Sequence, residues 1–166
     1  MKKIIVTGCN GQLGRAVNQQ YAGSTEYELV NTDVAELDIT KVDKVLELAR
    51  EVKPYAIINC AAYTNVDKCE VEQDLAYKIN AIGARNLAIA AADTGAKLMH
   101  ISTDYVFPGD VSVHPLTEFD SVSPKSMYGR REFRKRFRKS VLYHPYRSAV
   151  RRRSQLRKDH AEAGGK

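Results

Sequence analysis

Short apolar stretches alternate with longer amphipathic ones over the first two thirds of the chain. The short stretches are rich in β-branched and aromatic residues and predict strands near residues 3–7, 27–30, 55–59 and 97–101. Between them, apolar residues recur every three or four positions and predict helices near residues 12–21, 41–50 and 71–92. Strands joined by helices of this length need crossover connections, so the pattern predicts an α/β fold, a Rossmann-type parallel sheet with helices on both faces.

The first predicted strand runs into a glycine-rich turn that restarts as a helix. Gly8, Gly11 and Gly14 stand three residues apart in this glycine turn (residues 8–14). Such a turn brings backbone N–H groups and a helix N-terminus against a pyrophosphate, so it predicts a dinucleotide site. We expect Gly8 to make the tight turn, Gly11 to admit the phosphates and Gly14 to let helix and strand pack closely. The alternative is a glycine-rich turn of some other α/β protein.

Carboxylates follow the second predicted strand. Asp33 stands 19 residues beyond Gly14, where an acid can bond the ribose hydroxyls and repel a ribose phosphate, which favours NAD. Asp38 and Ile39 are expected to flank the adenine, with a plain loop role for either aspartate as the alternative. The residues after the third strand, 61–64, offer small side chains beside a cofactor.

Candidate chemistry follows the fourth predicted strand. Thr103 and Tyr128 can converge on a carbonyl oxygen, which the hydroxyl polarises while the phenol gives it a proton as hydride arrives. A phenol has an ordinary pKa of about 10 and needs a nearby ammonium to act near neutrality. Glu132 stands four residues after Tyr128, where a lysine would lie one helical turn away. We therefore expect Tyr128 to be a poor proton donor.

Charge divides the chain sharply in two. Residues 1–128 carry 12 Lys/Arg and 17 Asp/Glu (net −5), whereas the basic tail (residues 129–166) carries 14 and 3 (net +11). We expect a dinucleotide-binding domain over 1–128 and an aberrant or disordered tail over 129–166. No apolar run approaches the roughly 18 residues of a membrane helix and no leader appears, so we expect a soluble cytoplasmic protein without membrane partners. Three cysteines without metal or redox spacing predict no metal site.

Four motifs in order, residues 8–14, 59–67, 80–83 and 102–107, resemble the dTDP-4-dehydrorhamnose reductases, a family of extended short-chain dehydrogenase/reductases. The resemblance covers residues 2–130. It implies NADPH or NADH as cofactor and reduction of the 4-keto group of dTDP-4-dehydro-6-deoxy-L-mannose to dTDP-L-rhamnose. The implied cofactor contacts, taken together with the glycine turn, are Gly8, Gly11, Gln12, Leu13, Gly14, Asp33, Asp38, Ile39, Ala62, Tyr63 and Thr64.

By the same resemblance, Thr103 and Asp104 would meet the nucleotide-linked 4-keto-6-deoxyhexose, and Tyr128 would be the acid. The sequence departs from the family at Pro108, where an aspartate is more usual, and at Glu132, where the catalytic lysine is expected. The resemblance also implies a sheet that is incomplete at its C-terminal end, because the sugar-binding half does not follow Gly129. We expect little or no turnover from this chain.

The chain as a whole has three interpretations, and its tail could also be a solvated basic end that needs no partner. Read one nucleotide later, codons for residues 143–151 and 155–166 permit peptides that resemble segments following the catalytic tyrosine in this family, so we hypothesise a frameshift soon after Tyr128. Codons that forbid the shifted readings would contradict it. Alternatively, the chain is a non-catalytic dinucleotide-binding or regulatory module. The third interpretation, nucleic-acid binding by the tail, ranks lowest because the tail lacks a recognised reading motif. The choice of NAD or NADP and the oligomeric state stay open.

Overall fold

The fold is a parallel four-stranded sheet in the order β2-β1-β3-β4. The computed structural model describes residues 1–108, 116–117, 120–121, 123–126 and 128–129. The strands are β1 (Lys2–Thr7), β2 (Tyr27–Thr32), β3 (Ala56–Asn59) and β4 (Lys97–His100). Each lies within two residues of its predicted position, and every pairing is parallel. The predicted fold class is thereby confirmed.

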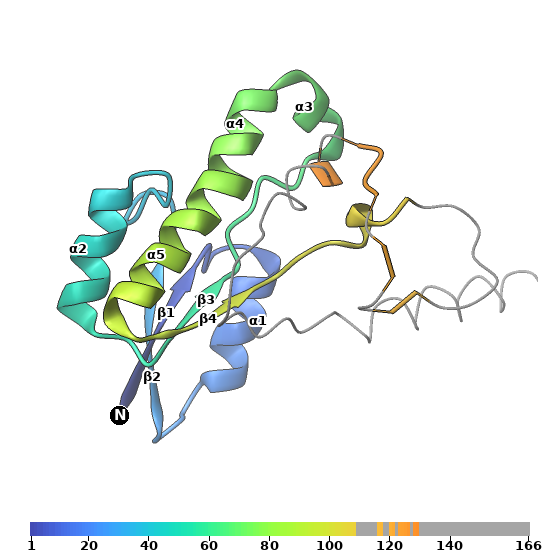
Figure 1. Ribbon diagram of the computed structural model, residues 1–166. Coiled ribbons are helices and arrows are strands. Elements are labelled where there is room, and N and C mark those ends of the chain that lie inside the picture. Colours follow the sequence, from blue (N-terminus) through green and yellow to red (C-terminus); the bar gives the residue numbers. More distant parts are fainter. Residues whose placement is uncertain (109–115, 118–119, 122, 127, 130–166) are drawn as a thin grey trace, which may run out of the picture.

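Helices cover the sheet from both sides (Figure 1). Helix α1 (Gln12–Tyr21) packs on one face, and α2 (Val42–Val52) and α5 (Ala84–Thr94) pack on the other. Two short helices, α3 (Val66–Val71) and α4 (Gln73–Tyr77), precede α5. A π-helical turn, η1 (Lys78–Gly83), joins α4 to α5, and a 3₁₀ turn, η2 (Asp104–Val106), follows β4. The single helix predicted over 71–92 is therefore three consecutive segments, because the apolar periodicity cannot show where an extra residue widens one turn.

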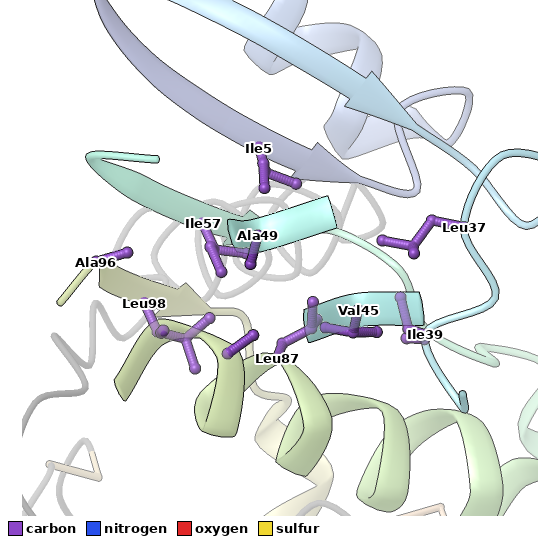
Figure 2. Packing of buried hydrophobic residues seen from close by; sticks show 11 residues of the cluster. Ile5, Leu37, Ile39, Val45, Ala49, Ile57, Leu87, Ala96 and Leu98 are labelled. Atoms are coloured by element: carbon purple, nitrogen blue, oxygen red, sulfur yellow. The ribbon is translucent and has the colours of Figure 1, made fainter. Parts of the chain in front are cut away.

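The larger core lies between the sheet and helices α2 and α5. Ile5, Ile57 and Leu98 project from three neighbouring strands, and Val45 and Leu87 meet them from the two helices, as Figure 2 shows. All five are no more than 4% exposed. Their burial removes apolar surface from water at roughly 25 cal/mol per Å², which makes this layer the main source of stability.

A smaller core lies on the other face of the sheet. Ile4, Val6 and Ile58 are buried there, and Val17 and Tyr21 of α1 pack against them. Ile4 to Thr7 are all buried, which is typical of a central parallel strand with both faces covered. No helix among the described residues is both long and apolar enough to cross a membrane. The basic tail from residue 130 onward, Glu132 included, lies outside the described residues.

Candidate functional site

The four strands end together at one edge of the sheet. The last register pairs are Thr7 with Thr32, Thr7 with Asn59, and Asn59 with His100. The loops that follow these residues therefore meet at the carboxyl edge, where open α/β sheets bind ligands. All predicted site residues belong to these loops, to the start of α1 or to the segment that ends at residue 129.

Two glycines of the glycine turn are required by the fold itself. Gly8 has φ +64°, and a Cβ on it would lie 2.7 Å from the backbone N and Cα of Ala61. A Cβ on Gly14 would lie 2.3 Å from the carbonyl oxygen of Gly8. A side chain at either position would force the first helix or the β3 loop away from β1.

Gly11 is different, because a Cβ there would meet only the Gly8 carbonyl oxygen, at 3.3 Å. Gly11 is exposed and forms the N-cap of α1. Among the described residues, helix α1 has no side-chain cap and no acidic residue in its first turn, so its first N–H groups lack an intrahelical acceptor. This helix end therefore suits an anionic group.

Asp33 ties the end of β2 to the glycine turn. Its carboxylate accepts hydrogen bonds from the backbone N–H of Asn10 (3.0 Å) and of Val34 (2.8 Å). The N–H of Cys9 also donates to the carbonyl oxygen of Thr32, at 3.1 Å. The structure thus brings two predicted cofactor residues, Asp33 and Gly11, to the same turn.

Asp38 and Ile39, the two residues expected at the adenine, have different surroundings. Asp38 accepts hydrogen bonds from the hydroxyl (2.7 Å) and backbone N–H (2.9 Å) of Thr40, and the hydroxyl contact holds the pKa of this carboxyl below its ordinary value. The Ile39 side chain is 6% exposed and belongs to the larger core, where its Cδ1 lies 2.6 Å from the position of a Cβ on Gly83. Ile39 therefore faces the core, and contact between it and an adenine stays a prediction.

Asn59 links three strand ends, a role that the sequence did not reveal. Its side-chain oxygen accepts from the Thr7 hydroxyl (2.7 Å) and from the Ala61 N–H (3.1 Å), and its amide nitrogen lies 2.8 Å from Nδ1 of His100. The residue is 2% exposed. A polar amide at the end of an apolar strand is the signal that could have indicated it, since buried polar groups need partners.

Tyr63 is held by both its backbone and its side chain. Asn80 in η1 accepts from the Tyr63 N–H (2.7 Å) and donates to the Tyr63 carbonyl oxygen (3.0 Å). The Tyr63 hydroxyl donates to the Glu72 carboxylate, which raises the pKa of the phenol to about 12. The flanking residues Ala62 and Thr64 are exposed at the same edge.

The predicted catalytic residues meet around η2. The Thr103 hydroxyl donates to the Asp104 carboxylate (3.2 Å) and accepts from the Tyr105 N–H (3.3 Å). The Tyr128 ring packs edge-to-face on the Tyr105 ring, with centroids 5.5 Å apart. A Cβ on Gly129 would lie 2.1 Å from the Tyr105 carbonyl oxygen, so the chain passes very close to η2. Residues 25 positions apart in sequence, Thr103 and Tyr128, are therefore neighbours of the same turn.

A cavity of about 300 Å³ adjoins this turn. Its lining mixes acidic, basic, hydroxyl and aromatic groups: Asp104, Tyr105, Phe107, Pro108, Lys125 and Ser126. Asp104 is the predicted sugar contact, and Pro108 is one of the two departures from the family pattern. Among the described residues, no three His, Cys, Asp or Glu side chains gather as metal ligands.

Comparison with known proteins gives consistent matches. Residues 1–156 match a family model described as the RmlD substrate binding domain. That match continues beyond Gly129, where the resemblance was expected to end. A dTDP-4-dehydrorhamnose reductase of Aggregatibacter actinomycetemcomitans is 41% identical over 130 residues, which make up 78% of this chain and 44% of that protein. The chain thus spans less than half the length of this relative.

Solved structures agree with the sequence matches. A dTDP-4-dehydrorhamnose reductase from Clostridium acetobutylicum is 54% identical with a TM-score of 0.76, covering 79% of this chain and 46% of that one. The reductase of Bacillus anthracis, crystallised with NADP, is 47% identical with a TM-score of 0.76, covering 80% and 47%. The resemblance stated from the four motifs is confirmed, and this chain belongs to the RmlD substrate binding domain family.

Proposed function

We propose that this chain binds NADPH or NADH as the cofactor half of a dTDP-4-dehydrorhamnose reductase and turns over its sugar substrate poorly or not at all. In this proposal residues 1–128 form the dinucleotide-binding domain and residues 129–166 an appended basic segment. In this proposal the protein works in the cytoplasm, where reduced nicotinamide cofactors are available.

The observation that carries the proposal is the glycine turn. Gly8 and Gly14 leave no room for a side chain, whereas a Cβ on Gly11, at the helix N-terminus, would meet one described atom, the Gly8 carbonyl oxygen at 3.3 Å. A pyrophosphate supplies the negative charge that such a helix end favours. In this proposal a ribose hydroxyl donates to Asp33, whose carboxylate the Asn10 N–H holds beside the glycine turn. The residues present therefore suit a dinucleotide.

The bound cofactor would supply hydride to the 4-keto carbon of the sugar. The chain's own residues would act on the carbonyl oxygen: the Thr103 hydroxyl would polarise it and the Tyr128 phenol would give it a proton. Asp104, which lines the adjoining cavity, would accept hydrogen bonds from sugar hydroxyls. A dTDP-linked 4-keto-6-deoxyhexose is the substrate class that the names of the relatives support.

Low turnover follows from the residue that stands where the ammonium is expected. The family resemblance leads us to expect a lysine at position 132, whose ammonium would help the Tyr128 phenol to release its proton, and this chain has Glu132 there instead. Binding of the cofactor and transfer of the proton are thus separable in this chain.

The test is a titration of the protein with NADPH and with NADH, followed by fluorescence, for the wild type and Gly11→Ala. We expect the wild type to bind and Gly11→Ala to raise Kd about tenfold or more, a loss of about 1.4 kcal/mol. Gly23→Ala, at the other end of α1, is the control and should bind as the wild type does. Absence of binding to either nucleotide would refute the proposal.

A second assay follows NADPH oxidation with dTDP-4-dehydro-6-deoxy-L-mannose. We expect no turnover above background by a wild-type protein that binds the cofactor. An ordinary enzymatic rate would overturn the inference drawn from Glu132 while leaving cofactor binding intact.

A further inference from the structure

One helical run holds two separate loops of the carboxyl edge. Asn80 in η1 is 2% exposed and makes both of its bonds to the backbone of Tyr63, in the β3 loop. Asn86 in α5 is 1% exposed and donates from its amide nitrogen to the carbonyl oxygen of Ile39, in the β2 loop, at 3.0 Å. Between them, Gly83 admits the Ile39 side chain.

Packing alone does not account for these two amides. Helix α5 otherwise presents Leu87, Ala90 and Ala91 to the core, and an apolar residue at position 86 would bury with less cost. The second amide atom of Asn86, Oδ1, is buried without a hydrogen-bond partner among the described residues. An unsatisfied buried acceptor lowers the stability of the folded state. We therefore expect the bond from Asn86 to the Ile39 carbonyl oxygen to serve function rather than stability.

The strand order indicates which half of a bound dinucleotide would lie beside each loop. The β2 loop lies on one side of the glycine turn of β1, and the β3 loop lies on the other side, toward β4 and Thr103. A dinucleotide with its pyrophosphate on the glycine turn has its adenosine half over β2 and its nicotinamide half over β3 and β4. Asn86 therefore acts on the loop of the adenosine half, and Asn80 on the loop of the nicotinamide half.

We infer that Asn80 and Asn86 are positioning residues of the cofactor site, which set the nicotinamide-side and adenosine-side loops independently from one helical run. Each acts through the backbone of a loop, Asn80 through Tyr63 and Asn86 through Ile39. The π-helical turn contains Asn80 and fixes its direction relative to Asn86, and such turns are frequent at functional sites. This inference rests on the proposed cofactor binding.

The experiment compares two ligands, ADP and NADPH, on three variants of the full chain. Asn86→Ala frees the β2 loop, so Kd for ADP and Kd for NADPH should rise together, by about tenfold. Asn80→Ala frees the β3 loop, so Kd for NADPH should rise by a similar factor while Kd for ADP changes less than twofold. Thr94→Val removes a hydroxyl bond to the Ala90 carbonyl oxygen in the same helix and should change neither.

Two further measurements keep the test decisive. Asn80→Asp retains the acceptor for the Tyr63 N–H and should recover part of the NADPH affinity. Amide hydrogen exchange of Tyr63 should accelerate in Asn80→Ala and not in Asn86→Ala, even where thermal stability falls in both.

Equal losses of both ligands in both variants would overturn the inference and indicate a general loss of structure. Unchanged affinities would overturn it as well. A wild type that binds neither ADP nor NADPH would instead refute the proposed function.

Discussion

The three glycines of the first turn meet three different steric conditions. Gly8 combines a left-handed backbone with contact to the β3 loop, a Cβ on Gly14 would overlap the backbone of its own turn, and a Cβ on Gly11 would meet the Gly8 carbonyl oxygen at 3.3 Å. Stability and cofactor affinity should therefore respond to different glycines. The same residue type at equal spacing serves two purposes, which sequence spacing alone cannot separate.

Gly8→Ala should cost far more stability than Gly23→Ala. Both glycines have positive φ, +64° and +76°, so both alanines carry the left-handed penalty of roughly 1–2 kcal/mol. Only the alanine at Gly8 also meets backbone atoms 2.7 Å away, whereas no atom of the described residues lies within 4 Å of a Cβ on Gly23. Urea unfolding of both variants checks this prediction. Equal losses of free energy of unfolding would contradict it.

Tyr63 should titrate late and confer a pH-dependent stability. Its pKa is raised from 10.0 to about 12 by the hydrogen bond to Glu72, so the folded state keeps the phenolic proton longer than the unfolded state does. The resulting stabilisation is complete below pH 10 and is lost as the pH rises from 10.0 towards about 12. Glu72→Gln should lower this pKa towards 10, as measured by NMR of labelled tyrosines.

Tyr55 provides an internal control for that titration. The hydrogen bond from the Lys97 ammonium, 2.7 Å away, lowers the pKa of its phenol. Because Tyr55 lies before β3 and does not contact Glu72, its titration should be the same in Glu72→Gln. A Tyr63 pKa that does not move in this variant would show that Glu72 is not the cause.

At the scale of elements, core packing and a surface ion pair both join helices α2 and α5. We expect the core to contribute much more to the free energy of unfolding than the ion pair does. Leu87 lies in the larger core at 1% exposure, whereas Arg50 of α2 and Asp93 of α5 form a two-bond ion pair at the surface. The Arg50 side chain is 61% exposed, so solvent screens most of the attraction.

Leu87→Ala should therefore destabilise the protein much more than Arg50→Gln. The expected losses are about 2–5 kcal/mol for the leucine and at most about 1 kcal/mol for the arginine. Chemical unfolding at low and high salt measures both, and only the Arg50 effect should diminish with salt. A larger loss from Arg50→Gln would mean that the ion pair, not the core, joins these helices.

The strands could be predicted from the sequence because each is a compact apolar run between turn residues. The helical stretch from 73 to 94 could not be predicted in detail, because the π-helical turn η1 leaves the apolar periodicity nearly unchanged. The positions of Gly11 and Asp33 beside the glycine turn could be expected from the sequence, and their contacts with a cofactor stay a prediction. Asn59, Asn80 and Asn86 were not, because a buried amide is defined by partners that are distant in sequence.

At the scale of the whole molecule, the charge difference suggests that the two parts of the chain are independent. We predict that a chain ending at Gly129, which lacks 14 Lys/Arg and 3 Asp/Glu of the basic tail, binds NADPH with the same Kd within about twofold. The full chain and the shortened chain are compared by NADPH titration and by salt-dependent retention on heparin. Loss of NADPH binding on shortening would contradict the proposed division at residue 128.

The strand order also determines when the chain can fold. β1 pairs with β3, and the bond from Thr7 to Asn59 spans 52 residues. The larger core then needs Leu87 and Leu98, which are synthesised later still. Contacts this distant in sequence make folding slow and leave apolar strands uncovered during synthesis. On the ribosome, the nascent chain should therefore depend on chaperones until β4 has emerged.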